Sequence, residues 1–174
     1  LGDSIRTYAF AKKLKEFCID LFNLDPKVVF GSDKDKNTKT GLLWKNMPTS
    51  TKKKGKMSIR EVLQYVGTDL FRKMSDNIWV DNCLSQIAKD SPDIALISDV
   101  RFENEVTAIQ GAGGYVVGLT RHSISDDTHD SEVGVEKCLE LCDAIIDNEE
   151  LTIPEQNEQI YNTTKHLDIF PEMG

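Results

Sequence analysis

The sequence predicts an α/β fold with a parallel β-sheet, and two observations carry this prediction. The first is a strand–helix–strand unit, in which continuous apolar runs at 94–97 and 115–119, typical of strands buried on both faces, flank an amphipathic stretch at 103–112. A connection that passes through a helix joins parallel strands, since antiparallel neighbours need only a tight turn. The second is that strand and helix patterns keep alternating along the chain, as in layered α/β domains. With 174 residues, we expect one domain over 1–174.

The N-terminal part of the chain contains the first strand and the first helix. Residues 7–10 predict a short strand, and the helix that follows places apolar side chains at helical spacing until Asp25-Pro26 ends it. Residues 27–57 are rich in lysine and lack periodicity, so we expect a basic loop or insertion there. The apolar face of the helix comprises Leu14, Phe17, Cys18, Leu21 and Phe22.

Two helices are expected in the middle of the chain. Ser58 and Glu61 form a capping-box pattern, in which the hydroxyl accepts from the third helical N–H while the carboxylate reaches back to the serine N–H. We expect this helix to stop at Gly67. A further helix follows, with Trp79 on its apolar side.

The C-terminal part completes the alternation of strands and helices. Residues 143–146 predict a third strand, and a final helix is expected from near Pro154 to before Phe170. The stretch 121–132, between the second and third strands, is polar and predicts a lid loop. His129 in this loop contacts a phosphate-bearing ligand or is an ordinary exposed histidine.

Polar residues follow the predicted strands at the sheet edge where ligands of parallel α/β folds bind. A carboxylate there can hold hydrated Mg²⁺, and an arginine can clamp phosphoryl oxygens with its planar guanidinium. The alternative is structural, with Asp99 capping the next turn and Arg101 paired with Glu105. The strand-end residues are Asp99 and Arg101, then Arg121, then Asp147 and Asn148.

Composition and charge exclude several classes of protein. No apolar run approaches the ~20 residues of a membrane span, and the net charge of −8 argues against a general nucleic-acid coat protein. The four cysteines form no Cys-x-x-Cys pair, which favours a reducing, cytoplasmic setting. Residues 27–60 nevertheless hold ten Lys/Arg, so this stretch is either a solvated surface or a phosphate-attracting arm.

A series of short motifs lies between residue 8 and about residue 150. Ser98-Asp-Val-Arg-Phe-Glu-Asn-Glu105 followed by His129-Asp-Ser-Glu132 is the most specific pair of these motifs. Together, and in this order, the motifs resemble those of the deoxynucleoside monophosphate kinases of tailed phages, a branch of the P-loop kinases. The other matching segments are Tyr8-Ala-Phe-Ala11 with Leu14-Lys15, Arg60-Glu-Val-Leu-Gln64, Gly67-Thr68-Asp69 with Arg72, Trp79-Val80, Gly113-Gly114, Thr120-Arg121 and Asp147-Asn148.

The resemblance implies a P-loop kinase-like, three-layer α/β fold with a small lid, here expected to lack its first strand and P-loop. It also implies ATP-dependent phosphorylation of deoxynucleoside monophosphates to diphosphates, with ATP and Mg²⁺ as cofactors. The implied partner is a deoxynucleoside monophosphate, no membrane partner is expected, nucleic acid is disfavoured and a homodimer is left open. A phage-encoded member would act in the host cytoplasm.

The resemblance further assigns roles to individual residues. Asp99 stands where the family holds its metal ion, and Asp99, Arg101 and Arg121 are the implied catalytic residues. ATP is implied to contact Arg121, His129 and Asn148. The residues implied to bind the monophosphate substrate are Lys15, Gln64, Thr68, Asp69, Arg72 and Trp79.

The chain departs from the family in its phosphate-binding loop. The pattern Gly-x-x-x-x-Gly-Lys-Ser/Thr has no match, and Gly55-Lys56 lacks the other required residues. Because family members carry a strand, a P-loop and a helix before the segment that begins at Tyr8, we expect about thirty residues to precede Leu1. Residues 1–174 alone are then expected to be inactive. Two alternatives stay open: a nucleotide-binding or assembly module without a P-loop, and a nucleic-acid-associated protein that uses the basic stretch 27–60.

Overall fold

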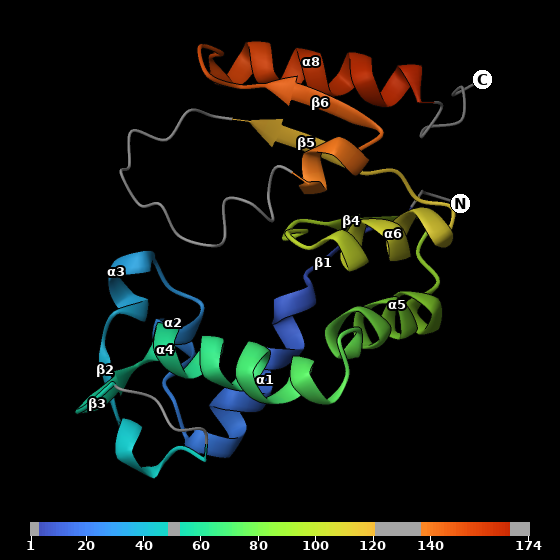
Figure 1. Ribbon diagram of the computed structural model, residues 1–174. Helices are drawn as coiled ribbons and strands as arrows, with labels where there is room; N and C mark the ends of the chain where they lie inside the picture. The colour runs from blue at the N-terminus through green and yellow to red at the C-terminus, as the bar shows by residue number, and fades with distance from the viewer. Residues whose placement is uncertain (1–3, 49–52, 121–136, 168–174) are drawn as a thin grey trace. The chain divides into compact units, whose positions relative to one another are not determined.

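The structure is a computed structural model, and it describes residues 4–48, 53–120 and 137–167. Helices and short parallel strand pairs follow one another along the chain, which confirms the predicted α/β class (Figure 1). The chain divides into two compact units, Leu1–Asp99 and Val100–Gly174. The expected single domain stays a prediction.

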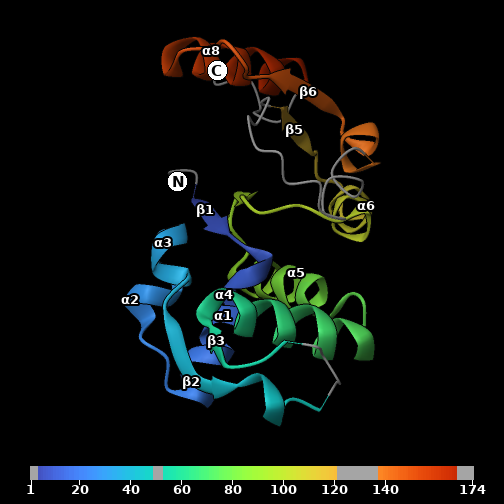
Figure 2. The ribbon, with the colours of Figure 1, turned by 60° about the vertical axis from the view of Figure 1, so that its left-hand side comes forward.

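The first unit contains a parallel pair of strands, β1 (Ile5–Tyr8) and β4 (Ile94–Ile97). The two strands lie side by side and pair along their whole length (Figures 1 and 2). β1 begins two residues earlier than the sequence predicts. Leu96 in β4 is 48% exposed, so burial of this strand on both faces is not found within the unit. The reason is that β4 pairs only with β1 among the described residues. A sheet of two strands is too narrow to bury both faces of either strand.

Two helices of the same unit pack against each other, α1 (Phe10–Phe22) and α5 (Ile78–Asp90). Cys18 on α1 is fully buried, and burial raises the pKa of its thiol to about 11. This thiol therefore stays protonated and unreactive at neutral pH. Leu21 is 60% exposed, so it does not belong to the buried face that the sequence predicts for it.

The basic segment 27–57, expected to be a loop or an insertion, contains several short elements of regular structure. Two brief helices each begin at a capping side chain, where Asp25 accepts from the Lys27 N–H and Ser32 accepts from the Asp35 N–H. Periodicity does not reveal such elements, because they are only three to five residues long. The elements are α2 (Pro26–Val29), α3 (Asp33–Lys36), the antiparallel strands β2 (Lys39–Leu43) and β3 (Lys56–Ser58), and the 3₁₀-helix η1 (Trp44–Asn46).

The capping box that the sequence predicts is confirmed at the start of α4 (Ile59–Gln64). Ser58 Oγ accepts from the Glu61 N–H at 3.2 Å, and Glu61 Oε2 accepts from the Ser58 N–H at 2.8 Å. The helix does not stop at Gly67, however. It continues as a π-helix, η2 (Tyr65–Arg72), so the predicted end of this helix is wrong.

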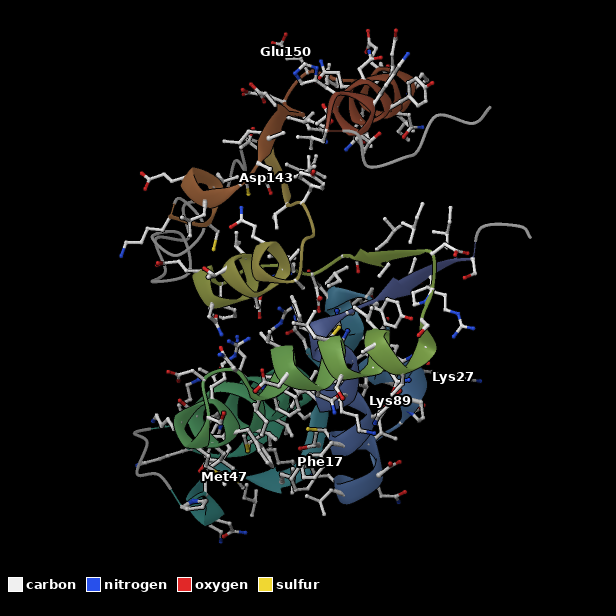
Figure 3. All side chains as sticks on the ribbon, turned by 90° about the vertical axis from the view of Figure 1, so that its right-hand side faces the viewer. Phe17, Lys27, Met47, Lys89, Asp143 and Glu150 are labelled. Atoms are coloured by element: carbon white, nitrogen blue, oxygen red, sulfur yellow. The ribbon has the colours of Figure 1, made fainter. Side chains whose placement is uncertain are left out.

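A hydrophobic core lies between α1, α4, η2 and the β2–β3 pair. The rings of Phe17 and Phe71 pack edge-to-face, with their centres 5.2 Å apart. Trp44 and Tyr65 pack in the same way, with ring centres 5.9 Å apart. Phe17 and Met47, labelled in Figure 3, pack against the buried members of this cluster. Those members are Cys18, Trp44, Met57, Val62, Tyr65 and Val66.

The capping box predicts a pH dependence of stability. The pKa of Glu61 is lowered, first by the Ser58 N–H and then by the Lys39 ammonium at 3.3 Å. A carboxylate with a depressed folded pKa stabilises the fold above its unfolded pKa, and this contribution is lost as pH falls through the folded pKa. Glu61→Gln should therefore lower the free energy of unfolding by about 0.5–1 kcal/mol at pH 7.

Urea titrations of Glu61→Gln and its parent at fixed ionic strength, from pH 8 to pH 3, measure this difference. It should stay constant down to about pH 5 and shrink below that, because the parent carboxylate becomes protonated. A difference that is independent of pH would show that the charge of Glu61 contributes nothing to the cap.

The second unit contains another parallel strand pair, β5 (Val117–Thr120) and β6 (Ala144–Asp147), which pair along their whole length. Helix α6 (Glu103–Gly111) precedes this pair, and α8 (Ile153–His166) follows it. These bounds confirm the predicted strands near 115–119 and 143–146 and both helices to within a few residues.

Asp143, labelled in Figure 3, connects the start of β6 to α6 and to the residue before β5 by hydrogen bonds. Its Oδ2 accepts from the Val116 N–H at 2.7 Å and from the Gln110 side chain of α6 at 3.2 Å. No helix in the described part of the chain is both long enough and apolar enough to cross a lipid bilayer.

Candidate functional site

Asp99 follows β4 at the carboxyl end of the first strand pair, where the sequence places a ligand site. Its Oδ1 accepts from the Phe10 N–H at 2.7 Å, and its Oδ2 accepts from the Ala11 N–H at 3.0 Å. The residue at the N-cap of α1 is Ala9, which has no side-chain oxygen, so Asp99, just after β4, supplies the cap of this helix. The structural alternative put the cap on the turn after Asp99, whereas the cap is on α1.

The strand end beside Asp99 is anchored by a second set of hydrogen bonds. The Tyr8 hydroxyl donates to Asp90 Oδ2 at 2.9 Å, and Gln86 donates to Asp90 Oδ1 at 2.8 Å. The bond from Tyr8 is the main reason that the pKa of Asp90 is lowered. The Ser98 N–H bonds to the Tyr8 carbonyl at 3.2 Å, so β1, β4 and the end of α5 are joined just before Asp99.

The six residues implied to bind the monophosphate all belong to the first unit and lie on elements that contact one another. Lys15 is on α1, and its ammonium lies 5.3 Å from the centre of the Phe30 ring. Gln64 ends α4 and is exposed, as is Thr68 in η2. Helix α1 contacts α4, η2 and α5, so the helices that bear these residues form one group.

The other three of these residues differ in how much of their surface is open. The Asp69 side chain is 45% exposed, and its carboxylate lies 3.9 Å from the Lys73 ammonium. Arg72 is half-buried at the end of η2. Trp79 on α5 is only 7% exposed, and its indole N–H donates to the Gly67 carbonyl at 3.2 Å. Asp69 and Arg72 therefore have surface open to a ligand, while the one polar group of Trp79 is engaged inside the protein.

Arg101 lies in the second unit, just before α6. Its backbone N–H donates to Glu105 Oε2 at 2.7 Å, and the Phe102 N–H donates to the same oxygen at 3.2 Å. Glu105 is only 2% exposed. The sequence suggests a pairing of Arg101 with Glu105, and the structure forms it through the main chain of Arg101.

Asp147 is the last residue of β6, and Asn148 follows it at the carboxyl end of the second strand pair. Asp147 Oδ1 accepts from the Glu149 N–H at 3.1 Å, and the Asn148 N–H donates to the Thr120 carbonyl at 2.9 Å. The side-chain oxygen of Asn148 is buried and has no hydrogen-bond partner in the described part of the chain. Buried acceptors in proteins normally have a hydrogen-bond partner, so this oxygen could accept a hydrogen bond from a bound molecule. Arg121, His129 and the lid 121–132 lie outside the described residues.

The described residues also limit how a metal ion could be held. They contain no group of three or more His, Cys, Asp or Glu side chains that could form a metal site. Mg²⁺ is commonly held by one or two carboxylates together with substrate phosphates and water. An ionised carboxylate offers about four lone-pair sites, so Asp99 can accept its two N–H bonds and still contact a hydrated ion.

Sequence reasoning missed the π-helix and the residues that hold it. A signal is present in the spacing of the apolar residues: Tyr65 and Leu70, and likewise Val66 and Phe71, are five positions apart. All four belong to or pack against the core cluster. A spacing of five fits the π-helix, whereas the spacing of four from Val62 to Val66 fits the α-helix before it.

Comparison with known proteins gives one consistent result. A family model described as "Deoxynucleotide monophosphate kinase" matches residues 4–160. The chain is 33% identical over 168 residues to the "Putative deoxynucleotide monophosphate kinase" of Acanthamoeba polyphaga mimivirus, covering 87% of this chain and 79% of the viral protein. It is 50% identical over 50 residues to the "Deoxynucleoside-5'-monophosphate kinase" of Escherichia phage T5, covering 28% of this chain and 20% of the phage protein.

Proposed function

The chain belongs to the deoxynucleotide monophosphate kinase family, and we propose that it transfers the γ-phosphoryl group of ATP to the phosphate of a deoxynucleoside monophosphate. The observation that carries this proposal is the family match over residues 4–160, which includes every described residue of the candidate site. The protein is thus a phosphotransferase. Its action in the cytoplasm, of a host cell if the gene is viral, is part of the proposal.

In more detail, we propose that the chain has the three-layer α/β fold of a P-loop kinase, with a parallel sheet between helices and a lid at 121–132. Two features support it. The strand pairs β1–β4 and β5–β6 are both parallel, and parallel pairs are normally parts of larger sheets covered by helices. Exposed apolar side chains on these strands, such as Leu96 and Leu119, agree with strands that belong to a wider sheet.

The phosphates would be bound at the strand ends. Asp99 would hold a hydrated Mg²⁺, and this ion would neutralise charge on the phosphoryl oxygens. Arg101 and Arg121 would stabilise the negative charge on the transferred group with their guanidinium groups. The bonds from Phe10 and Ala11 to Asp99 fix its carboxylate in place, which supports a role that needs a fixed charge.

The two nucleotides would bind to different residues. The residues at the deoxynucleoside monophosphate would be Lys15, Gln64, Thr68, Asp69 and Arg72. Trp79 would complete this site from its buried position against η2. ATP would contact Arg121, His129 and Asn148. The Asn148 side-chain oxygen, buried and without a partner in the described part of the chain, supports this assignment, because the exocyclic amino group of adenine is a hydrogen-bond donor.

The direct test is turnover by the full-length protein with ATP, Mg²⁺ and each of the four common deoxynucleoside monophosphates. We expect formation of ADP and the deoxynucleoside diphosphate in equal amounts with at least one of them. Binding of a nucleotide without any turnover would instead support a nucleotide-binding module, and it would overturn the proposed activity.

Asn148 gives a prediction on the ATP side. Asn148→Ala should raise the KM for ATP about fivefold and change the KM for the deoxynucleoside monophosphate by less than about twofold, because one hydrogen bond contributes ~1 kcal/mol. Steady-state kinetics with each nucleotide varied in turn measures both constants. An equal rise in both would show that Asn148 supports the fold of the whole site and does not bind ATP.

A further inference from the structure

The π-helix η2 is the most unusual stretch of backbone in the described chain. Its eight residues, Tyr65–Arg72, continue directly from the α-helix α4. π-helices are rare, mostly form single turns and are frequent at functional sites. Because the winding is unfavourable compared with an α-helix, its surroundings must hold it in place.

The winding of η2 decides which side chains face the core. Tyr65 and Val66 are buried, and Leu70 and Phe71, each five positions further on, pack against the same cluster. In an α-helix with 3.6 residues per turn, residues five apart point about 140° away from each other. Rewinding η2 as an α-helix would therefore turn Leu70 and Phe71 away from the core, or turn Tyr65 and Val66 away from it.

The same winding sets the directions of the polar residues between these apolar ones. Thr68 is exposed and the Asp69 side chain is 45% exposed, while Gly67 just before them is buried. Arg72 ends the π-helix. A change of winding would rotate all three polar side chains with respect to α1, which bears Lys15.

Two contacts at Gly67 hold η2 against its neighbours. A Cβ atom at this position would lie 2.6 Å from Leu14 Cδ2, so a larger residue here would force the end of the Leu14 side chain of α1 to move. The Gly67 carbonyl accepts the hydrogen bond of the Trp79 indole N–H at 3.2 Å, and this bond is buried. The Trp79 ring also packs on Phe71 at 5.6 Å, and Phe71 in turn packs on Phe17 of α1.

We propose that Trp79 is a positioning residue: its bond to the Gly67 carbonyl keeps η2 wound as a π-helix, and this winding directs Thr68, Asp69 and Arg72 toward the deoxynucleoside monophosphate. The inference rests on the proposed function. Trp79 itself is buried, and its one side-chain hydrogen-bond donor, the indole N–H, is engaged with Gly67. It therefore acts on the substrate through η2 and not by touching it.

The test is Trp79→Phe in the full-length protein, with steady-state kinetics for both nucleotides. Phenylalanine keeps a ring against Phe71 but removes the N–H. We expect the KM for the deoxynucleoside monophosphate to rise at least about fivefold, as for a lost hydrogen bond, while the KM for ATP changes less than about twofold. A loss of folded protein would lower the apparent kcat without this split between the two KM values.

Trp44→Phe is the matched control. Trp44 is also buried, at 6% exposure, and packs edge-on against Tyr65 at the start of η2. This variant loses a buried indole from the same core and should lose stability, but both KM values should stay within about twofold of the parent. A rise in the KM for the monophosphate as large as that of Trp79→Phe would overturn the inference, since any loss of packing would then suffice.

A second substitution at position 79 decides the case if Trp79→Phe does not fold. Benzothienylalanine, introduced by stop-codon suppression, has the shape of tryptophan with sulfur in place of the N–H group. It should reproduce the rise in the KM for the monophosphate. Parent-like KM values in this isosteric variant would overturn the inference alone, whereas an inactive parent protein would overturn the proposed function and this inference with it.

Discussion

Replacing Asp99 by asparagine is expected to lower turnover at saturating ATP, deoxynucleoside monophosphate and Mg²⁺ about a hundredfold or more. The charge of Asp99 would hold the hydrated metal ion, and a neutral amide of the same shape attracts Mg²⁺ far less. The Mg²⁺ concentration for half-maximal rate should also rise. Steady-state rates over a range of Mg²⁺ concentrations measure both effects.

The same substitution should also destabilise the protein. Asp99 accepts from the Phe10 and Ala11 N–H groups with its two oxygens, whereas asparagine has one acceptor oxygen and presents an NH₂ group to the other donor. The loss of half of a helix cap, and of a negative charge at the helix N-terminus, should lower the free energy of unfolding by ~1 kcal/mol. Urea unfolding followed by circular dichroism measures this change.

Ser58→Ala separates the two effects of the Asp99 substitution. It removes the cap of α4, in which Ser58 Oγ accepts from the Glu61 N–H, and should cost a similar ~1 kcal/mol. Its turnover per folded molecule should equal that of the parent, because Ser58 has no part in the proposed phosphate site. If Asp99→Asn behaved in the same way, Asp99 would be a helix cap and nothing more.

Sequence reasoning was most successful where a pattern repeats over several residues. The predicted run at 94–97 is β4, residue for residue, and α6 differs from its predicted end by one residue. Continuous apolar runs and amphipathic helices have lengths at which periodicity can be recognised. The capping box at Ser58 was also found, since its two residues are close together in the sequence.

The features that the sequence did not reveal share a physical cause: the deciding contact is distant, or the element is too short. The segment 27–57 contains elements of three to five residues, in which no period can develop. Gly67 predicts the end of a helix from its intrinsic preference. In the structure it lies inside a continuous helix, because Leu14 of α1 and Trp79 of α5 pack against it.

The candidate site shows the same division. The rule that ligands bind at strand ends identified Asp99 and Asn148 as residues of interest, and Asn148 proves to have a buried oxygen without a partner in the described part of the chain. The rule could not show that Asp99 caps α1. The two residues whose N–H groups it accepts, Phe10 and Ala11, lie 89 and 88 positions before it in the sequence. Nor could it show that Glu105 bonds to the main chain of Arg101.

Glu105→Ala is expected to have the largest effect on stability in the second unit, with a loss of ~2 kcal/mol in the free energy of unfolding. The Glu105 side chain is 2% exposed, and one of its oxygens accepts from the Arg101 N–H at 2.7 Å and the Phe102 N–H at 3.2 Å. Alanine would leave both donors without this acceptor and would leave a cavity behind α6. Glu105→Gln should lose less, because its amide oxygen can still accept from these N–H groups.

Glu103→Ala is the matched control, because it removes the same side chain from the same helix. Glu103 is exposed, and its carboxylate lies 3.8 Å from the ammonium of Lys137, which is also exposed. Such surface pairs contribute ~0–1 kcal/mol, so Glu103→Ala should stay within about 0.5 kcal/mol of the parent in urea unfolding. Equal losses for the two variants would mean that burial and the two backbone bonds of Glu105 add nothing. A loss confined to Glu105→Ala would identify its carboxylate as the group that fixes the main chain at Arg101, a residue of the proposed phosphate site.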